Sequence, residues 1–125
     1  MSGSRYVFDT NAIVALLQGN AQLIQLTQDA DWIGISVISQ IEFLVFPGLT
    51  ESDRQLFQAF LQRVEILGLI ATDGALIHRI IEIRQQYRLK LPDAVIAAVT
   101  FHHSAILVTA DQEFSKVNSL SVVHW

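Results

Sequence analysis

The stretch VFDTNAIVALL, residues 7–17, decides the fold. Val7 and Phe8 close a short apolar run that is typical of a buried strand, and residues 12–17 form an apolar run that is typical of a helix. Asp9 lies at the junction between the two elements. A strand that passes almost directly into a helix predicts an α/β fold, and the charge at the junction needs a physical reason.

The same alternation of strands and helices continues along the chain. Short apolar or β-branched runs predict strands at residues 5–8, 32–35, 66–71, 105–109 and 121–124. Helical patterns fill the gaps, at residues 10–18, 20–29, 37–46, 54–63, 73–89 and 93–103. This alternation predicts a parallel sheet with helices on both faces, in which ligands bind beyond the carboxyl ends of the strands.

The composition indicates one soluble domain that spans residues 1–125. A chain of 125 residues can bury a core without disulfides, and 51% of its residues are hydrophobic. No apolar run approaches the roughly 18 residues that a membrane span needs. The absence of cysteine fits a reducing compartment, so we expect a cytoplasmic protein without a membrane anchor. The net charge of −4 is unlike that of a general nucleic-acid binder, which is usually basic.

Two aspartates follow predicted strands. Asp9 comes directly after the run at 5–8, and Asp111 follows the run at 105–109 after one alanine. Taken singly, Asp9 reads as a helix N-cap and Asp111 as a turn residue. Because the carboxyl ends of parallel strands share one edge of the sheet, the two acids are also expected where such a fold binds its ligands.

Glu42 and Asp93 lie on predicted helices. Glu42 falls on the apolar stripe made by Ile38, Ile41 and Val45, which predicts a buried carboxylate, although a helix that faces solvent would leave it at the rim. Asp93 follows Pro92 at a helix start, where the helix dipole favours an acid. The helix it begins is apolar all round, so Asp93 is expected to face the interior or a cleft.

Taken together, these four acids predict a metal site. Carboxylates held close together repel one another and raise one another's pKa. Mg²⁺ and Mn²⁺ relieve this repulsion because they prefer oxygen ligands. Two such ions can activate a water and stabilise a leaving oxygen in phosphodiester hydrolysis. The hypothesis for Asp9 is therefore a metal ligand placed by the end of a strand.

The residues that carry this hypothesis resemble the PIN domain, and most of all the VapC-type toxins of bacterial type II toxin–antitoxin systems. The resemblance runs in order from Tyr6 to the last predicted strand. Four motifs carry it: Asp9-Thr10-Asn11, Ser39-x-x-Glu42, Leu91-Pro92-Asp93-Ala94-x-Ile96-Ala97-Ala98, and Leu107-Val108-Thr109-x-Asp111-x-Glu113-Phe114.

The resemblance implies a three-layer α/β/α sandwich with a central parallel, Rossmann-like sheet. It implies an endoribonuclease that depends on Mg²⁺ or Mn²⁺, a VapB-like antitoxin that blocks the site, and commonly a homodimer. The family's metal-binding and catalytic acids correspond here to Asp9, Glu42, Asp93 and Asp111. Asn11 and Thr109 match its polar supporting residues, and Glu113 falls where many members carry an additional acid.

Basic residues near Asp93 are candidates for contacts with the RNA backbone. Arg84, Arg88 and Lys90 precede it in the chain, and Lys90 is only three residues away. Arg84 and Arg88 fit a solvated helix face equally well. Phe57 and Phe60, three residues apart on one helix face, fit either the core or a surface covered by an antitoxin or a second subunit.

Several alternatives accompany this interpretation. A haloacid-dehalogenase-type enzyme needs a second aspartate where Asn11 stands, a receiver domain needs paired acids after the first strand, and no glycine-rich phosphate loop exists. The serious alternative is a catalytically silent PIN-fold module that binds protein or RNA. The four acids argue against it, because a pure binding module gains nothing from carboxylates that repel one another.

Overall fold

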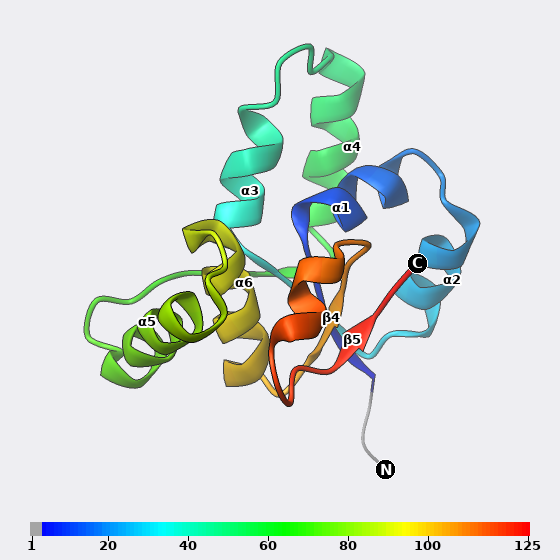
Figure 1. The fold of residues 1–125 in the computed structure, drawn as a ribbon. Helices are drawn as coiled ribbons and strands as arrows, with labels where there is room; N and C mark the ends of the chain where they lie inside the picture. The colour runs from blue at the N-terminus through cyan, green and yellow to red at the C-terminus, as the bar shows by residue number, and fades with distance from the viewer. Residues whose placement is uncertain (1–3) are drawn as a thin grey trace.

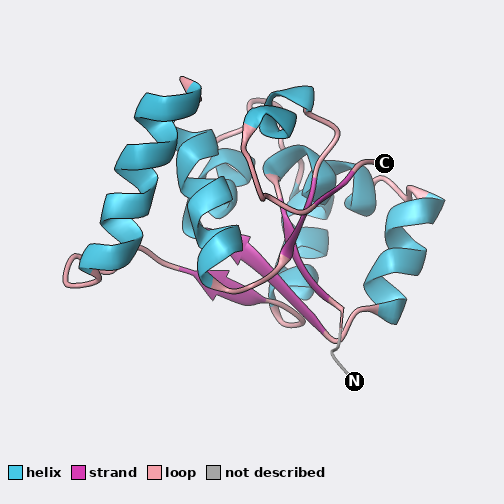
Figure 2. Ribbon diagram, turned by 60° about the horizontal axis from the view of Figure 1, so that its bottom comes forward, coloured by secondary structure: helices cyan, strands magenta, loops and turns pink. Residues whose placement is uncertain are grey.

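The computed structural model describes residues 4–125 and contains one parallel sheet between layers of helices (Figures 1 and 2). The sheet has the order β3-β2-β1-β4-β5. Its strands are β1 (Arg5–Phe8), β2 (Trp32–Ser36), β3 (Glu65–Leu67), β4 (Ile106–Val108) and β5 (Val122–Val123). The helices are α1 (Thr10–Leu17), α2 (Ala21–Asp29), α3 (Val37–Leu44), α4 (Glu51–Leu61), α5 (Gly74–Tyr87), α6 (Leu91–His102) and a 3₁₀ helix, η1 (Gln112–Lys116). The predicted α/β/α sandwich is confirmed.

The central strands are apolar because both of their faces are covered. Side chains of a strand point alternately to opposite faces, so Val7 and Leu107 pack with α5 and α6, whereas Phe8 and Val108 pack into the second core cluster. That second cluster contains Ile13 of α1, together with residues of α2, α3 and α4. Both cores meet at β1, the middle strand of the sheet.

The topology places the end of β1 at a switch point. The chain leaves β1 and returns beside it as β2, while β4 pairs on the other side of β1. The register sets Phe8 opposite Val108, and the Asp9 amide donates to the Val108 carbonyl at 3.2 Å. Ligand sites of doubly wound sheets lie at such points, beyond the carboxyl ends of the strands.

Most predicted limits shift by one or two residues in the structure, and three elements change more in proportion to their length or at one end. The strand predicted at 66–71 ends at Leu67, because its partner β2 ends at Ser36 and turns into α3, which leaves residues 68–71 without a ladder partner. The helix predicted at 54–63 starts earlier, at Glu51, because the Thr50–Asp53 capping box forms at its N-terminus. The last strand is shorter than predicted and comprises only Val122 and Val123.

Of the two predictions for Phe57 and Phe60, the core is correct and the partner surface is wrong. Both side chains are buried in the second core, where Phe57 stacks on Phe43 with ring centroids 4.2 Å apart. They face inward because α4 is amphipathic and packs this side against the sheet layer, leaving Leu56 on the outside. Within residues 4–125, no helix is both long and apolar enough to cross a bilayer.

Candidate active site

Asp9 caps α1 and is almost fully buried. Its backbone is extended, with φ −76° and ψ 174°, and its Oδ1 accepts a hydrogen bond from the Ala12 amide at 2.8 Å. Only 5% of the residue is exposed. The N-cap interpretation of Asp9 is therefore correct. The cap uses only one carboxylate oxygen, and it does not explain why the side chain is buried.

Asp111 is held by the turn that follows β4. Its backbone amide donates to Oγ1 of the buried Thr109 at 2.9 Å, and its Oδ1 accepts from the Glu113 amide at 2.9 Å. The second bond caps η1, and the buried ring of Phe114 anchors this turn to the core. Thr109 thereby fixes the backbone that presents Asp111.

Asp93 lies in the first turn of α6. Pro92 precedes it near the helix start, and the N-cap residue Lys90 provides no side-chain hydrogen bond. The next seven residues, 94–100, are all buried, so the helix axis is fixed by the core. Asp93 therefore lies at the positive end of a rigid helix, where an acid is favoured.

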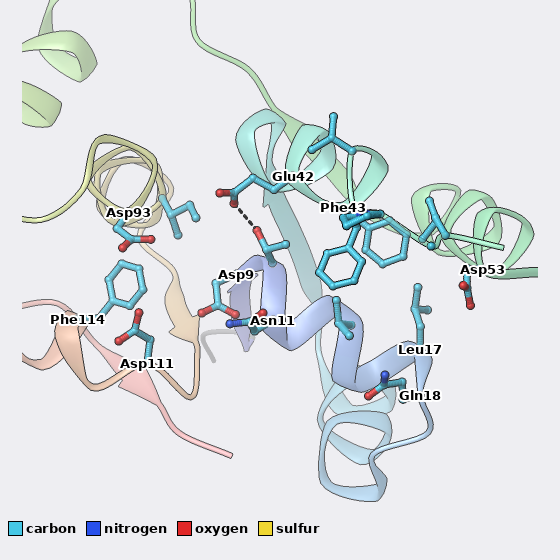
Figure 3. A pocket seen from close by; sticks show the side chains of 18 residues that line it. Asp9, Asn11, Leu17, Gln18, Glu42, Phe43, Asp53, Asp93, Asp111 and Phe114 are labelled. Carbon is cyan, nitrogen blue, oxygen red and sulfur yellow. Dashed lines mark hydrogen bonds between the residues drawn. The ribbon is translucent and has the colours of Figure 1, made fainter.

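Glu42 is positioned by α3 and by Thr10. The Thr10 hydroxyl donates to Glu42 Oε1 at 2.6 Å (Figure 3). The prediction that Ile41 and Val45 form a buried stripe is wrong, because these residues are 52% and 71% exposed. The buried face of α3 is instead the one that carries Ser39 and Phe43, so Glu42 lies at the rim of the helix interface.

All four acids line one pocket of about 550 Å³. Figure 3 shows Asp9, Asp93, Asp111 and Glu42 reaching toward the same hollow from different elements. These elements lie far apart in the sequence, so only the folded sheet brings the acids together. The structure thus places the four predicted acids around one pocket, and for Asp9 and Asp111 this is where the strand-end argument expects them.

The acids interact electrically. Burial is the largest cause that raises the pKa of Asp9, and the charges of Asp111 and Asp93 raise it further against hydrogen bonds from Thr109 and Ala12. The pKa of Asp93 is also raised, first by burial and then by Asp111 and Glu42. Glu113 adds to this effect, whereas Lys90 opposes it. The site therefore disfavours its own full ionisation and favours a bound cation.

The donor chemistry fits a hard divalent cation. Carboxylate oxygens are the ligands that Mg²⁺ and Mn²⁺ prefer, and the mutual repulsion would be relieved by one ion. Among residues 4–125, however, no three acidic or histidine side chains lie close enough together to form a ready-made ion-binding group. An ion would therefore have to draw these carboxylates closer than they lie here.

The remaining predicted residues divide by position. Asn11 lines the pocket and Thr109 supports its wall, whereas Glu113 does not line it and pairs with Lys116 at 2.7 Å. Lys90 is exposed beside Asp93. Arg88 ends α5 in a left-handed conformation with φ 56°, which gives it a structural function outside the pocket.

Sequence reasoning missed two features of the pocket. It assigned no function to Thr10, although the residue stands inside the Asp9-Thr10-Asn11 motif. It also missed the apolar extension of the pocket along α1 and the α3–α4 turn, whose lining includes Val14, Leu17 and Phe46. No local pattern predicts this extension, because it depends on how the turn at Pro47-Gly48 lies against α1.

Sheet order and acidic pocket together define a class of α/β/α proteins with a carboxylate site at the switch point of the sheet. Residues 6–120 match the family model of the PIN domain. The chain therefore belongs to the PIN domain family.

Solved structures show the same fold. A chain of a toxin–antitoxin complex from Klebsiella pneumoniae is 28% identical, with a TM-score of 0.77 and coverage of 94% of this chain and 95% of that one. VapBC2 from Rickettsia felis, bound to a promoter DNA fragment, is 22% identical, with a TM-score of 0.79 and coverage of 97% and 98%. VapBC-1 from nontypeable Haemophilus influenzae is 19% identical, with a TM-score of 0.74 and coverage of 97% and 98%. The comparison with curated protein sequences finds no match.

Proposed function

We propose that this protein is a metal-dependent endoribonuclease that acts as the toxin of a type II toxin–antitoxin system of the VapBC type. The observation that carries the proposal is the pocket that Asp9, Glu42, Asp93 and Asp111 line together, in which burial and neighbouring carboxylates raise the pKa of Asp9 and of Asp93. A fold needs no such cluster for stability, because each buried or crowded carboxylate works against folding. The cluster is therefore best explained by chemistry.

Asp9, Asp93 and Asp111 would hold the metal, with Glu42 completing the set directly or through water. When bound, Mg²⁺ or Mn²⁺ supplies an activated water and stabilises charge on the scissile phosphate. The protein's own part is positioning. Thr10 holds Glu42 by a 2.6 Å hydrogen bond, and the buried Thr109 holds the backbone amide of Asp111.

Asn11 and Lys90 extend the site toward a substrate. Asn11 is exposed inside the pocket and can donate its amide to a phosphate oxygen or a base edge. Lys90 is exposed next to Asp93 and can contact the RNA backbone. Arg88 is a weaker candidate for contact with the RNA, because it is the C-cap residue of α5 and lies outside the pocket.

An antitoxin partner is proposed from the solved relatives. The Klebsiella structure is a toxin–antitoxin complex, and the match with this protein covers 95% of the Klebsiella chain. An unpartnered nuclease would attack the RNA of its own cell, so an inhibitor that covers the acidic pocket fits the proposed activity.

A homodimer is proposed on the face formed by α3, α5, α6 and the loop after β3. Leu91 is 59% exposed, Ile81 48% and Leu69 41%, and they line a hollow that only apolar residues surround. Exposed apolar area of this kind usually marks an interface. Light scattering should give the mass of two chains, and Ile81→Glu should give one; a monomeric wild type would contradict the proposal.

The direct test of the proposed activity is cleavage of a labelled total-RNA pool by the purified, antitoxin-free protein. We expect cuts with Mn²⁺ or Mg²⁺, none with EDTA, and none with Asp9→Asn prepared in the same way. Cleavage that survives Asp9→Asn would mean a contaminant. A folded protein that cleaves nothing with either metal would favour the silent binding module instead.

A further inference from the structure

The pocket is longer than the acidic cluster needs. From Asp9 it continues along α1 past Asn11 and Val14 to Leu17 and Gln18, a distance of about 10 Å from Asn11 to Gln18 at the helical rise. Figure 3 shows Leu17, Gln18 and Asp53 at the end of the pocket away from Asp93 and Asp111. We call this end the distal arm and define it by Val14, Leu17, Gln18, Val45, Phe46 and Leu49.

Phe46 is the unusual member of the distal arm. It follows α3 directly and is 62% exposed, whereas Phe43, one turn earlier, is buried in the core against Phe57. Because most of the Phe46 ring is exposed, it contributes little to the packing of the core. Core packing therefore does not explain why an aromatic residue stands at this position. Its place in the wall of the same pocket as Asp9 gives it access to anything bound there.

The chemistry of the distal arm suits a neutral, flat group. No lysine or arginine lines the pocket as described for residues 4–125, so this arm does not provide cations for phosphate groups. It offers an exposed ring, aliphatic side chains and the exposed side-chain amide of Gln18, and the exposed amide of Asn11 lies between this arm and the acids. The Asp53 carboxylate also lines this end of the pocket, but it already accepts a hydrogen bond from the Thr50 amide in the capping box of α4. Proteins bind unpaired nucleobases with this combination, in which a ring stacks on the base and amides meet its edge.

We propose that the distal arm binds an unpaired nucleobase of the RNA, next to the scissile phosphate, with Phe46 as the stacking platform. The inference rests on the proposed function and deepens it, because it assigns a residue of this chain to the contact with a base beside the cut. The phosphate lies at the acidic end, and the adjacent base lies over α1 against Phe46. Phe46 is thus a specificity-determining residue that does not touch the reacting atoms.

The test compares four proteins: the wild type, Phe46→Ala, Phe46→Tyr and the control Ile70→Ala. Ile70 has the same exposed fraction, 62%, and lies outside the pocket. On a short single-stranded RNA taken from the mapped cleavage site, Phe46→Ala should lower kcat/KM about tenfold or more. Phe46→Tyr should keep most of the activity, and Ile70→Ala should cleave like the wild type.

A second set of substrates locates the base. Each nucleotide that flanks the cut is replaced in turn by an abasic one. The inference predicts that one replacement lowers the rate of the wild type and leaves Phe46→Ala unchanged, because the stacking partner is already missing. The inference would be overturned if Phe46→Ala cleaved as fast as the wild type. It would also be overturned if Phe46→Ala stayed slower than the wild type on every abasic substrate. Neither result would contradict the proposed nuclease activity.

Binding in EDTA separates the inference from the proposed function. The same RNA, carrying 2-aminopurine at the flanking position, should lose fluorescence on the wild type and keep it on Phe46→Ala. This result without cleavage would support the base site and count against the nuclease. Neither binding nor cleavage would overturn both. A change of mass in light scattering of Phe46→Ala would also overturn the inference, since it would assign Phe46 to a contact between subunits.

Discussion

Asp9 combines a stabilising hydrogen bond with a destabilising charge. Its Oδ1 caps α1, yet burial and the charges of Asp111 and Asp93 raise its pKa above the ordinary value of 3.8. Asparagine keeps the capping oxygen and removes the charge. We therefore expect Asp9→Asn to raise the stability of the metal-free protein at pH 7 by about 1 kcal/mol, or roughly 3–5 °C in Tm.

The pH dependence of this gain has a definite sign. Below pH 3.8 Asp9 is protonated in both the folded and the unfolded chain, so the charge contributes nothing. As the pH rises above 3.8, the unfolded chain releases its proton first, and the wild type loses stability relative to Asp9→Asn until the folded carboxyl has ionised as well. Melting curves from pH 3 to 8 check this. Asp31→Asn is the control, because Asp31 accepts a backbone hydrogen bond at an exposed position. A difference in Tm between the wild type and Asp9→Asn that stays constant with pH would contradict this assignment of the Asp9 charge.

Thr10 provides a test of positioning. Thr10→Val keeps the shape of the side chain and removes the hydroxyl that donates to Glu42. We expect cleavage to fall about tenfold or more, as it does when groups that orient metal ligands are removed, with little change in Tm. The control is Thr27→Val, which removes a comparable half-buried hydroxyl bonded to Leu23 on α2. An equal loss of activity in both variants would contradict the proposal that the Thr10 hydroxyl positions Glu42 for cleavage.

The positions of three of the acids could be predicted from the sequence because they follow from chain geometry, whereas the stripe that placed Glu42 was wrong. Asp9 and Asp111 stand after strands, and Asp93 begins a helix, so their common location follows from a parallel sheet. The partner of Glu42 could not be predicted. The Thr10 hydroxyl reaches it across 32 residues of sequence, and that contact depends on how α3 packs beside α1.

Among the elements, β2 shows how one glycine shapes a layer. The Trp32 ring lies over Gly34, where an added Cβ would come within 2.5 Å of the indole and 3.0 Å of Leu67. Trp32 also holds His103 in a stack at 5.5 Å and the Arg5 guanidinium at 4.2 Å from its ring. The glycine therefore allows an aromatic side chain to lie flat on the sheet.

Gly34→Ala should displace this indole. We expect a loss of about 1–3 kcal/mol in the free energy of unfolding, as for other overpacked interiors, and a shift in tryptophan emission. Chemical denaturation measures the first effect. Gly68→Ala is the matched control, since an added Cβ there meets nothing within 4 Å. Similar stabilities for Gly34→Ala and the wild type would show that the sheet yields at this point.

The element boundaries could be predicted where local chemistry sets them. Asp9 caps α1, Asn20 caps α2 and the Thr50–Asp53 box caps α4, and each is visible in the sequence. The apolar stripe on α3 was predicted on the wrong side. Its apolar residues lie on more than one face of the helix, and the buried face is decided by the stacking of Phe43 on Phe57. The end of β3 could not be predicted from local sequence either, because β3 ends where its partner β2 ends.

In the whole molecule, charge is distributed unevenly. Of the 12 acidic side chains, four form the cluster at one end of the pocket, and the other eight, which include Asp53 at its far end, balance the eight basic residues. The net negative charge therefore does not argue against RNA as a substrate. Bound divalent cations would reverse the sign of the pocket and make it attractive to phosphate.

The proposed activity requires that the four carboxylates bind a cation at one site together. Calorimetric titration of the metal-free protein with Mn²⁺ tests it most directly, because the readout needs no RNA and no antitoxin. We predict saturable binding by the wild type, weakened at least tenfold in Asp9→Asn and in Asp111→Asn, and unchanged in Asp31→Asn. Binding that is absent in the wild type, or equal in all four proteins, would contradict the claim.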